Sequence, residues 1–312
     1  MFAATIISNG VIFMNNKVIY SHKQVFDILK LKDLDEILIN NGLERERIRI
    51  MPNFCVMPNY INGLTVHTKL TVPPALIGSD IGCGILCVKL ENTDIDTALL
   101  DETIRKFVPF GRNVHEKSVV EFDFESDRPY KRFERCLGSL GGGDHFISLD
   151  TDENNNKYLL IHSGSRGYGM MVSHCFKYNE YYTEKLRDKD YYKNIRICLR
   201  FAKTNREQIA RLILSEMNLK AEKYIDIPHN YIDTSMGILR KSAISGKEDE
   251  DIVIFYKGGS LIGKGLGESA YNFSAPAYKL DDEQSIDDFV KMLDKTVHID
   301  KVLKTVYYFK PE

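Results

Sequence analysis

Short segments with strand-like and helix-like hydrophobic patterns alternate along this chain, and this alternation limits the possible folds more than any other feature. Apolar residues recur at helical spacing over 191–217, whereas 11–20 shows two β-rich runs about an Asn-Asn turn, which is typical of a hairpin. Further predictions are strands over 48–56, 84–90 and 296–309, a helix over 94–108, and a helix start at Ser285 with Asp288 three residues later. The chain is therefore predicted to be a mixed α+β protein.

The segment 191–217 gives the clearest helical pattern. Its apolar positions share one periodicity: Ile195, Cys198, Leu199, Ala202, Ile209, Leu212 and Ile213. The intervening positions carry the basic residues Arg196, Arg200, Lys203 and Arg211. This basic face could meet RNA, but a face in solvent is the simpler interpretation.

Composition and charge indicate a globular protein. The 312 residues include 42 Lys+Arg and 44 Asp+Glu, a net charge of −2, with 43% hydrophobic and 28% charged residues. These values exclude disordered chains, collagens, small disulfide scaffolds and strongly basic nucleic-acid coat proteins. Since no Pro/Gly/Ser-rich or charged linker divides the sequence, we expect one large domain over 1–312.

Three features of the sequence predict the cellular compartment. Residues 1–10 do not fit a secretory signal, because no Lys or Arg precedes the apolar stretch. No apolar run approaches the ~20 residues that span a bilayer. Six irregularly spaced cysteines are typical of reduced thiols, so a cytoplasmic location is expected.

A first cluster of reactive residues lies in the turn 77–84, where Asp80 and Cys83 stand three residues apart among glycines. Such a turn can aim a carboxylate and a thiol at one point. The alternative is a buried cysteine at a corner between a turn and a strand.

Three further loops each contain a histidine. A glycine run over 141–143 leads to Asp144, His145 and Phe146, and can present N–H groups to phosphate oxygens. His162 precedes two hydroxyls and an arginine, which suits phosphate binding, and His229 precedes an amide side chain. Taken singly, the glycine run could be a flexible turn and His162 a core histidine.

Together these loops offer one carboxylate, one thiolate and three imidazoles, from Asp80, Cys83, His145, His162 and His229. This set is sufficient for two divalent ions that share a bridging sulfur. Two such ions can hold a phosphoryl group, so a phosphate substrate is implied. Thiolate and imidazole also suit zinc, so ligand type leaves the metal open. The other histidines, which lack comparable surroundings, are His22, His67, His115, His174 and His298.

In order along the chain, these stretches resemble the RtcB family of RNA-splicing ligases. The matching segments are 80–84, 141–146, 162–167, 229–230 and 240–243, with weaker similarity over 201–206 and 259–265. The similarity covers nearly all of the chain after about Ile48, whereas residues 1–47 are divergent. The resemblance implies a single RtcB-like α+β domain around a central metal cleft.

The family joins RNA 3′-phosphate or 2′,3′-cyclic phosphate ends to 5′-hydroxyl ends, with manganese and GTP, in tRNA splicing and RNA repair. By resemblance, the five residues of the mixed donor set hold two manganese ions, with zinc as the alternative. Cys83, which would bridge the ions, and His145 would be catalytic. Nucleotide or phosphate contacts are implied for Asp144, Phe146, Ser163, Ser165, Arg166, Asn230, Lys241, Ser260 and Lys310.

The sequence departs from the family where a histidine accepts GMP. An ungapped alignment places Ala277 at that position, and the following Gly-Ala-Gly-Arg run is absent. A second alignment matches 277–279 to a later family stretch, so that a block containing the nucleophile is deleted. Asp144 and Ser148 stand where many members have Asn and Glu, and 51–55 reads Met-Pro-Asn-Phe-Cys in place of Met-Pro-Asp-x-His.

Three functions follow from this pattern. The chain could be a ligase of the usual family type that uses a substitute nucleophile. It could be a ligation-deficient paralogue that binds or hydrolyses RNA phosphate ends, because a methyl group cannot form a phosphoramidate with GMP. It could also be a regulatory module that associates with an active family member, with zinc in a structural role.

Overall fold

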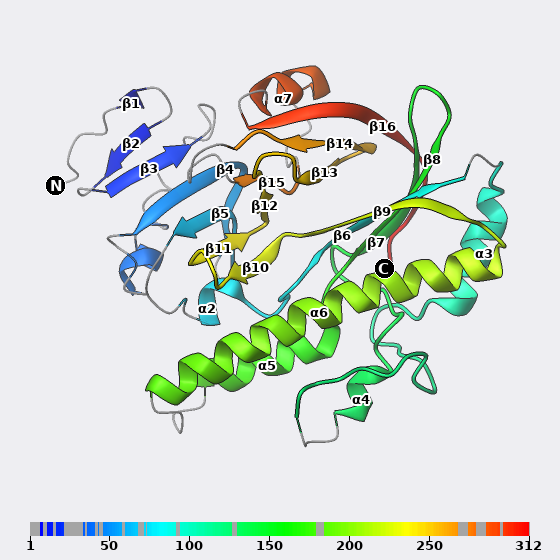
Figure 1. Cartoon of the computed structure of the whole chain (residues 1–312), viewed down its shortest axis with the longest axis horizontal. Coiled ribbons are helices and arrows are strands. Elements are labelled where there is room, and N and C mark those ends of the chain that lie inside the picture. Colours follow the sequence, from blue (N-terminus) through cyan, green and yellow to red (C-terminus); the bar gives the residue numbers. More distant parts are fainter. Residues whose placement is uncertain are drawn as a thin grey trace. The chain divides into compact units, whose positions relative to one another are not determined.

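A computed structural model describes residues 7–8, 11–14, 17–21, 34, 36–40, 43, 46–57, 60–67, 72, 74–91, 94–126, 130–178, 184–267, 274–278, 285–293 and 296–311. Figure 1 labels the helices and strands of the described residues. The chain divides into two compact units, each assembled from three chain segments. The first unit comprises Met1–Gly78, His229–Lys257 and Leu261–Asp300, and the second comprises Ser79–Pro228, Gly258–Ser260 and Lys301–Glu312. The single domain expected over 1–312 stays a prediction.

The first unit is mainly β-structure. Its elements are β1 (Ile7–Ser8), β2 (Val11–Met14), β3 (Lys17–Ser21), β4 (Arg47–Met57), β5 (Tyr60–His67), α2 (Pro74–Ile77), β10 (Asn230–Asp233), β11 (Ile238–Lys241), β12 (Ala243–Ser245), β13 (Asp251–Tyr256), β15 (Ser274–Pro276) and α7 (Ile286–Leu293). One sheet has the strand order β1-β2-β3-β4-β5-β11-β10, and β12 pairs separately with β15. Within the larger sheet only the β3–β4 pair is parallel among the registers of the described residues.

The expected hairpin over 11–20 is confirmed, because β2 pairs with β3 from Val11↔Tyr20 to Met14↔Lys17. Its two Asn residues lie outside the described residues. Ser285 also begins a helix as expected: its hydroxyl accepts from the Asp288 backbone N–H at 3.1 Å, at the start of α7.

The described residues of the second unit form a sheet and four helices. Its elements are β6 (Gly84–Leu90), α3 (Thr97–Phe107), α4 (Lys131–Glu134), β7 (Phe146–Thr151), β8 (Lys157–Ser163), α5 (Arg166–Tyr178), α6 (Glu184–Glu216) and β9 (Ala221–Pro228). The boundary between the units falls inside β14 (Gly259–Gly265) and β16 (Val297–Phe309). Within this unit the strand order is β16-β7-β8-β6-β9.

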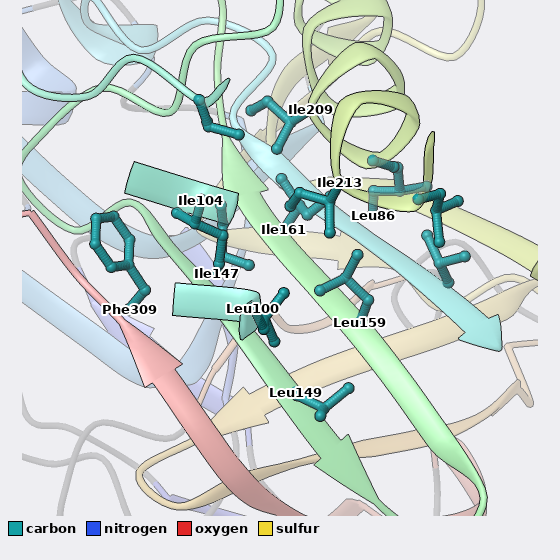
Figure 2. Close-up of a cluster of buried hydrophobic side chains, with 14 of the residues drawn as sticks. Leu86, Leu100, Ile104, Ile147, Leu149, Leu159, Ile161, Ile209, Ile213 and Phe309 are labelled. Atoms are coloured by element: carbon teal, nitrogen blue, oxygen red, sulfur yellow. The ribbon is translucent and has the colours of Figure 1, made fainter. Parts of the chain in front are cut away.

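The core of the second unit lies between one face of this sheet and the helices α3 and α6 (Figure 2). Alternate residues of a strand point to opposite faces, so Ile147 and Leu149 of β7 join this core. The remaining labelled members come from β6, β8, β16 and the two helices: Leu86, Leu159, Ile161, Phe309, Leu100, Ile104, Ile209 and Ile213. Phe146 and His162 lie directly opposite each other in the β7–β8 register and point to the other face.

Both predicted helices are present, with bounds that differ by one to seven residues from the prediction. Helix α3 begins after Asp96, whose carboxylate accepts from the backbone N–H groups of Ala98 and Leu99. Helix α6 starts seven residues before the expected 191 and ends one residue before the expected 217. Within the described residues, none of the helices combines the length and apolarity needed to cross a lipid bilayer. All six cysteines are free thiols.

Candidate metal centre

Cys83 is fixed by a tight turn at the start of β6. Its N–H donates to the Asp80 carbonyl at 3.2 Å, and Gly82 has a φ of +79° in the left-handed region. A Cβ on Gly84 would lie 2.5 Å from the Ile227 carbonyl oxygen, so glycine is required for this close approach to β9. Cys83 is therefore buried at a defined position beside the strand ends.

Two histidines face this thiol from the β7–β8 pair. His145 directly precedes β7 and His162 is next to last in β8, so antiparallel pairing brings the rings within 5.4 Å, centroid to centroid. The Cys83 Sγ lies 3.1 Å from His162 Nε2 and 3.5 Å from His145 Nε2. The thiol and the two imidazoles therefore converge although up to 79 residues separate them in sequence.

Asp80 adds a carboxylate to the same point. Its Oδ2 lies 3.5 Å from His145 Nε2, and the donor atoms of Asp80, Cys83 and His145 all lie within 4.8 Å of one another. A Cβ on Gly164 would overlap the Asp80 Oδ1 atom, so glycine at 164 leaves the space that the carboxylate occupies.

The protonation of both histidine rings follows from their other nitrogens. His145 Nδ1 lies 2.9 Å from the Leu140 carbonyl oxygen, and His162 Nδ1 lies 2.8 Å from the Asp144 carbonyl oxygen. Because a carbonyl oxygen only accepts, each Nδ1 carries the proton and donates it. In the neutral rings both Nε2 lone pairs then point toward the Cys83 sulfur, as in histidines that bind metals.

The charge of Asp80 completes the set of acceptors. Partial burial raises the pKa of this carboxyl, but hydrogen bonding and positive charge from His145, with further help from Cys83, hold it well below its ordinary value. When both imidazoles are neutral, the carboxylate, the sulfur and two imidazole lone pairs face one another, and a bound cation would supply the positive charge that a protonated His145 otherwise supplies. The donor set therefore fits a divalent metal that accepts nitrogen, sulfur and oxygen ligands.

His229 belongs to the first unit and follows the last residue of β9 directly. Pro228 pairs with Gly84, the residue after Cys83, so the chain leaves the second unit next to the turn that carries the thiol. The assignment of His229 as a fifth ligand stays a prediction. In the first unit, Asn230 Oδ1 accepts from the Ser242 N–H at 2.9 Å, and Lys241 Nζ donates to the Ile77 carbonyl at 2.9 Å.

The residues predicted to grip phosphate hold the loops of the second unit together. The fully buried Ser163 hydroxyl donates to the Leu140 carbonyl at 2.8 Å, and the Ser165 hydroxyl donates to the Ile81 carbonyl. Arg166 donates from Nε to the Ser139 hydroxyl at 3.0 Å and from Nη2 to the Gly111 carbonyl at 2.9 Å. Phosphate contacts at these positions stay predictions, and the side chains also have a structural role that sequence reasoning did not assign.

The remaining residues predicted to bind nucleotide or phosphate make contacts with other side chains of the second unit. Lys310 Nζ lies 3.4 Å from the Asp144 carboxylate, and the Phe146 ring lies 5.2 Å from the ring of His162. The Lys310–Asp144 pair offsets the added charge of Asp144, although both side chains are exposed, which makes the pair weak. Ser260 instead donates to the buried Asp150 carboxylate at 2.7 Å.

Two residues next to each other in α6 were missed as functional candidates. Asn205 and Arg206 are almost completely buried and donate to backbone carbonyls beside Cys83 and His162. Both residues lie in the segment 201–206, whose sequence is weakly similar to the RtcB family. However, helical periodicity alone gives no reason for an arginine to lie inside the protein.

Known proteins resemble this chain over much of its length. The family model described as tRNA-splicing ligase RtcB matches residues 115–262. The RNA-splicing ligases RtcB1 and RtcB of two Escherichia coli strains are each 26% identical over 287 residues, covering 71% of this chain and 70% of the relative. RNA-splicing ligase RtcB2 of Escherichia coli is 29% identical over 206 residues, covering 60% of this chain and 54% of the relative.

The chain is therefore a mixed α+β protein with a His/Cys/Asp cluster at the strand ends that could hold a metal ion. The family model over 115–262 and the relatives of 26–29% identity support membership of the RtcB family.

Proposed function

We propose that this protein acts on RNA 3′-phosphate or 2′,3′-cyclic phosphate ends at a metal centre and does so without a GMP adduct. The observation that carries the proposal is the convergence of Asp80, Cys83 and His145 within 4.8 Å, with His162 Nε2 3.1 Å from the same sulfur. Family membership supports RNA-end chemistry, because the relatives are named RNA-splicing ligases.

The residues of this chain would hold one or two divalent ions, with His229 as the further predicted ligand. Such ions supply positive charge to phosphoryl oxygens and activate water. His145 and His162 keep Nε2 available because the Leu140 and Asp144 carbonyls hold the Nδ1 protons. Manganese is the metal that the family resemblance implies, and zinc is the alternative that the ligand types allow.

The absence of a nucleophilic imidazole favours the ligation-deficient reading over the usual ligase route. Ala277 is buried, its N–H donates to the Ser242 carbonyl at 3.3 Å, and its methyl side chain cannot bond to GMP. The alignment to the relatives spans 287 positions but takes in 71% of 312 residues, about 222, so about 65 of its positions have no counterpart here. This shortfall supports a deleted block. Downstream, His298 is the remaining histidine, and it is exposed on β16.

A covalent labelling experiment separates the two catalytic functions. The protein is incubated with radiolabelled GTP and manganese and then resolved by denaturing electrophoresis. We expect no protein-bound label even when manganese is shown to be bound. A label would establish a substitute nucleophile and return the protein to the ligase class, with His298→Ala as the first variant to map it.

Turnover of RNA ends tests the proposed activity directly. An oligoribonucleotide with a 2′,3′-cyclic phosphate or 3′-phosphate is incubated with the manganese-loaded protein, and opening of the ring or release of phosphate is followed. Cys83→Ala should abolish bound metal and turnover, whereas Cys87→Ala should keep both, since Cys87 lies four residues along β6 outside the cluster. Absence of turnover together with RNA binding would leave the regulatory module, which could associate with an active family member.

RNA affinity should also respond to salt. Contacts to phosphates release counterions, so the logarithm of the binding constant should fall linearly with the logarithm of the salt concentration. A fluorescent 3′-phosphorylated oligonucleotide titrated at three salt concentrations measures the slope. Binding that does not change with salt would contradict a site that grips phosphate.

A further inference from the structure

Arg206 of α6 makes an unusually complete set of buried contacts in the second unit. Its side chain is 1% exposed and forms a two-pronged pair with Asp226 of β9, at 2.6 Å from Nε and 2.9 Å from Nη2. Its Nη1 donates to the Gly82 carbonyl at 2.9 Å and to the Ser163 carbonyl at 2.8 Å. One rigid guanidinium therefore joins α6, β9, the turn before β6 and the end of β8.

Each backbone partner of Arg206 stands next to a proposed metal ligand. Gly82 directly precedes Cys83, and Ser163 directly follows His162. Asp226 lies opposite Leu86 in the β6–β9 register, two residues before the end of β9. The guanidinium fork thus sets the spacing between the Gly82–Cys83 peptide, which leads into the thiol residue, and the Ser163–Gly164 peptide, which begins one residue after His162.

Asn205, the preceding residue, makes the corresponding contacts to the glycine-rich loop. Its Oδ1 accepts from the N–H groups of Gly138 and Ser139 at 2.8 and 3.1 Å. Its Nδ2 lies 3.0 Å from the Ser163 hydroxyl and 3.3 Å from the Gly164 carbonyl. The same turn of α6 therefore also anchors the loop that leads to His145.

Helix α6 approaches these loops too closely for other side chains to intervene. A Cβ on Gly82 would lie 2.9 Å from the Ala202 Cβ and 3.1 Å from the Cys198 carbonyl oxygen. The turn before Cys83 is therefore pressed against the helix one turn before Arg206. A shift of α6 would move the turn and the thiol with it.

Stability alone does not account for an arginine at this position. Removing an arginine and a carboxylate from water is costly, and a buried ion pair can often be replaced by apolar residues of similar size without loss of stability. Apolar residues cannot donate to the Gly82 and Ser163 carbonyls. What Arg206 adds is the fixed geometry of those two carbonyls.

We propose that Arg206, oriented by Asp226, is a positioning residue of the metal centre: it holds the peptides beside Cys83 and His162 so that sulfur and Nε2 meet at the metal. The inference rests on the proposed metal centre. Supporting interactions of this kind typically change metal affinity by about 10–100-fold.

The test compares cobalt binding by the full chain and by the double variant Arg206→Met, Asp226→Leu. Cobalt(II) bound to a thiolate gives a near-ultraviolet charge-transfer band, so the titration reports both affinity and ligation by Cys83 without measuring activity. The double variant removes both buried charges together and should remain folded. Arg200→Met is the matched control, because Arg200 lies on the same helix but pairs with Glu125 at the surface.

We expect wild type and Arg200→Met to bind cobalt with equal affinity and the double variant to bind at least about tenfold more weakly, with a reduced charge-transfer band. Equal affinity and an unchanged band in a folded double variant would overturn the positioning role and leave the proposed function intact. Failure of the wild type to bind cobalt, manganese or zinc would overturn both.

The single variant Arg206→Lys keeps the test decisive if the double variant does not fold. Its ammonium retains the positive charge beside Asp226 but lacks the fork that reaches two carbonyls and a carboxylate together. The positioning role predicts weaker cobalt binding in this variant as well, whereas a role of charge alone predicts wild-type affinity.

Discussion

At the scale of single residues, the candidate metal centre depends on positions without a side chain as well as on the proposed ligands. Gly164 leaves room for the Asp80 carboxylate, and Gly141 has a φ of +93° beside His145 and Arg166. A methyl group at either position would occupy space that a functional side chain fills. Glycine is therefore required here by packing against neighbouring side chains.

Gly164→Ala should weaken metal binding about tenfold or more, since its Cβ would displace the Asp80 Oδ1 atom. Cobalt or manganese titration measures the effect. Gly142→Ala is the control, because a Cβ there meets nothing closer than 3.7 Å. Equal affinity in the two variants would show that Asp80 is not a ligand.

A second residue-scale prediction concerns acid stability at Asp152, in the turn between β7 and β8. Burial raises the pKa of this carboxyl, but hydrogen bonds from Asn156, Lys301 and Tyr158 outweigh it, so the folded pKa lies below the unfolded one. The folded state then binds protons less readily than the unfolded state. The resulting stabilisation is fully present above about pH 4, the unfolded value, and is lost as the pH falls toward the folded pKa.

Asp152→Asn should therefore cost on the order of 1–3 kcal/mol at pH 7 and flatten the decline of stability below about pH 4. Urea unfolding at pH 7, 5, 4 and 3 gives both quantities. Glu153→Gln, at an exposed position in the same turn, is the matched control. Parallel profiles for wild type and Asp152→Asn would contradict the assigned pKa direction.

At the scale of elements, α6 serves two purposes along its length. Its segment around Asn205 and Arg206 contacts the loops of the metal centre, whereas Ile209 and Ile213 pack into the core on the sheet (Figure 2). Helix α5 runs alongside α6 (Figure 1). Because the apolar segment with Ile209 and Ile213 is packed in the core, the segment with Asn205 and Arg206 can hold the loops in a fixed position.

Ile213→Ala should destabilise the protein by about 2–5 kcal/mol, because the side chain is fully buried and its removal leaves a cavity. Chemical denaturation followed by circular dichroism gives the change in unfolding free energy. Ser215→Ala, at an exposed position two residues on, should change stability by less than about 0.5 kcal/mol. A small effect at Ile213 would mean that α6 does not depend on this core.

At the scale of the whole molecule, the proposed ligands come from distant parts of the chain, so metal binding should couple to folding. Asp80, Cys83, His145 and His162 meet only when β6, β7 and β8 are paired. A metal that binds this folded arrangement and not the unfolded chain raises the free energy of unfolding. The effect should be visible without any catalytic assay.

Manganese at about 100 times its dissociation constant should add about 2.7 kcal/mol to stability, and a chelator should reverse the gain. Thermal melts with manganese and with chelator measure the shift in Tm. His162→Ala should lose the shift, whereas His174→Ala, on α5 outside the cluster, should retain it. A shift of equal size in His162→Ala would place the metal elsewhere.

Much of the local structure was predictable because the signals are local. The strand predicted over 84–90 has the same bounds as β6. The helix cap at Ser285 was predictable from Ser285 and Asp288, which stand three residues apart in the sequence. The types of metal donor were also predictable, because residue identity determines side-chain chemistry. Their placement in loops was predictable from the neighbouring glycines. The sequence by itself therefore determined the fold class, the family and the candidate ligands.

Only the tertiary structure decided how these parts meet. Strand pairing placed His162 3.1 Å from Cys83, and it turned the Ser163 and Ser165 hydroxyls into internal donors. The burial of Arg206 depends on Asp226, 20 residues away on β9. Such outcomes depend on long-range packing and the pairing of buried charges, whereas helical and strand periodicity records only which face of an element is apolar.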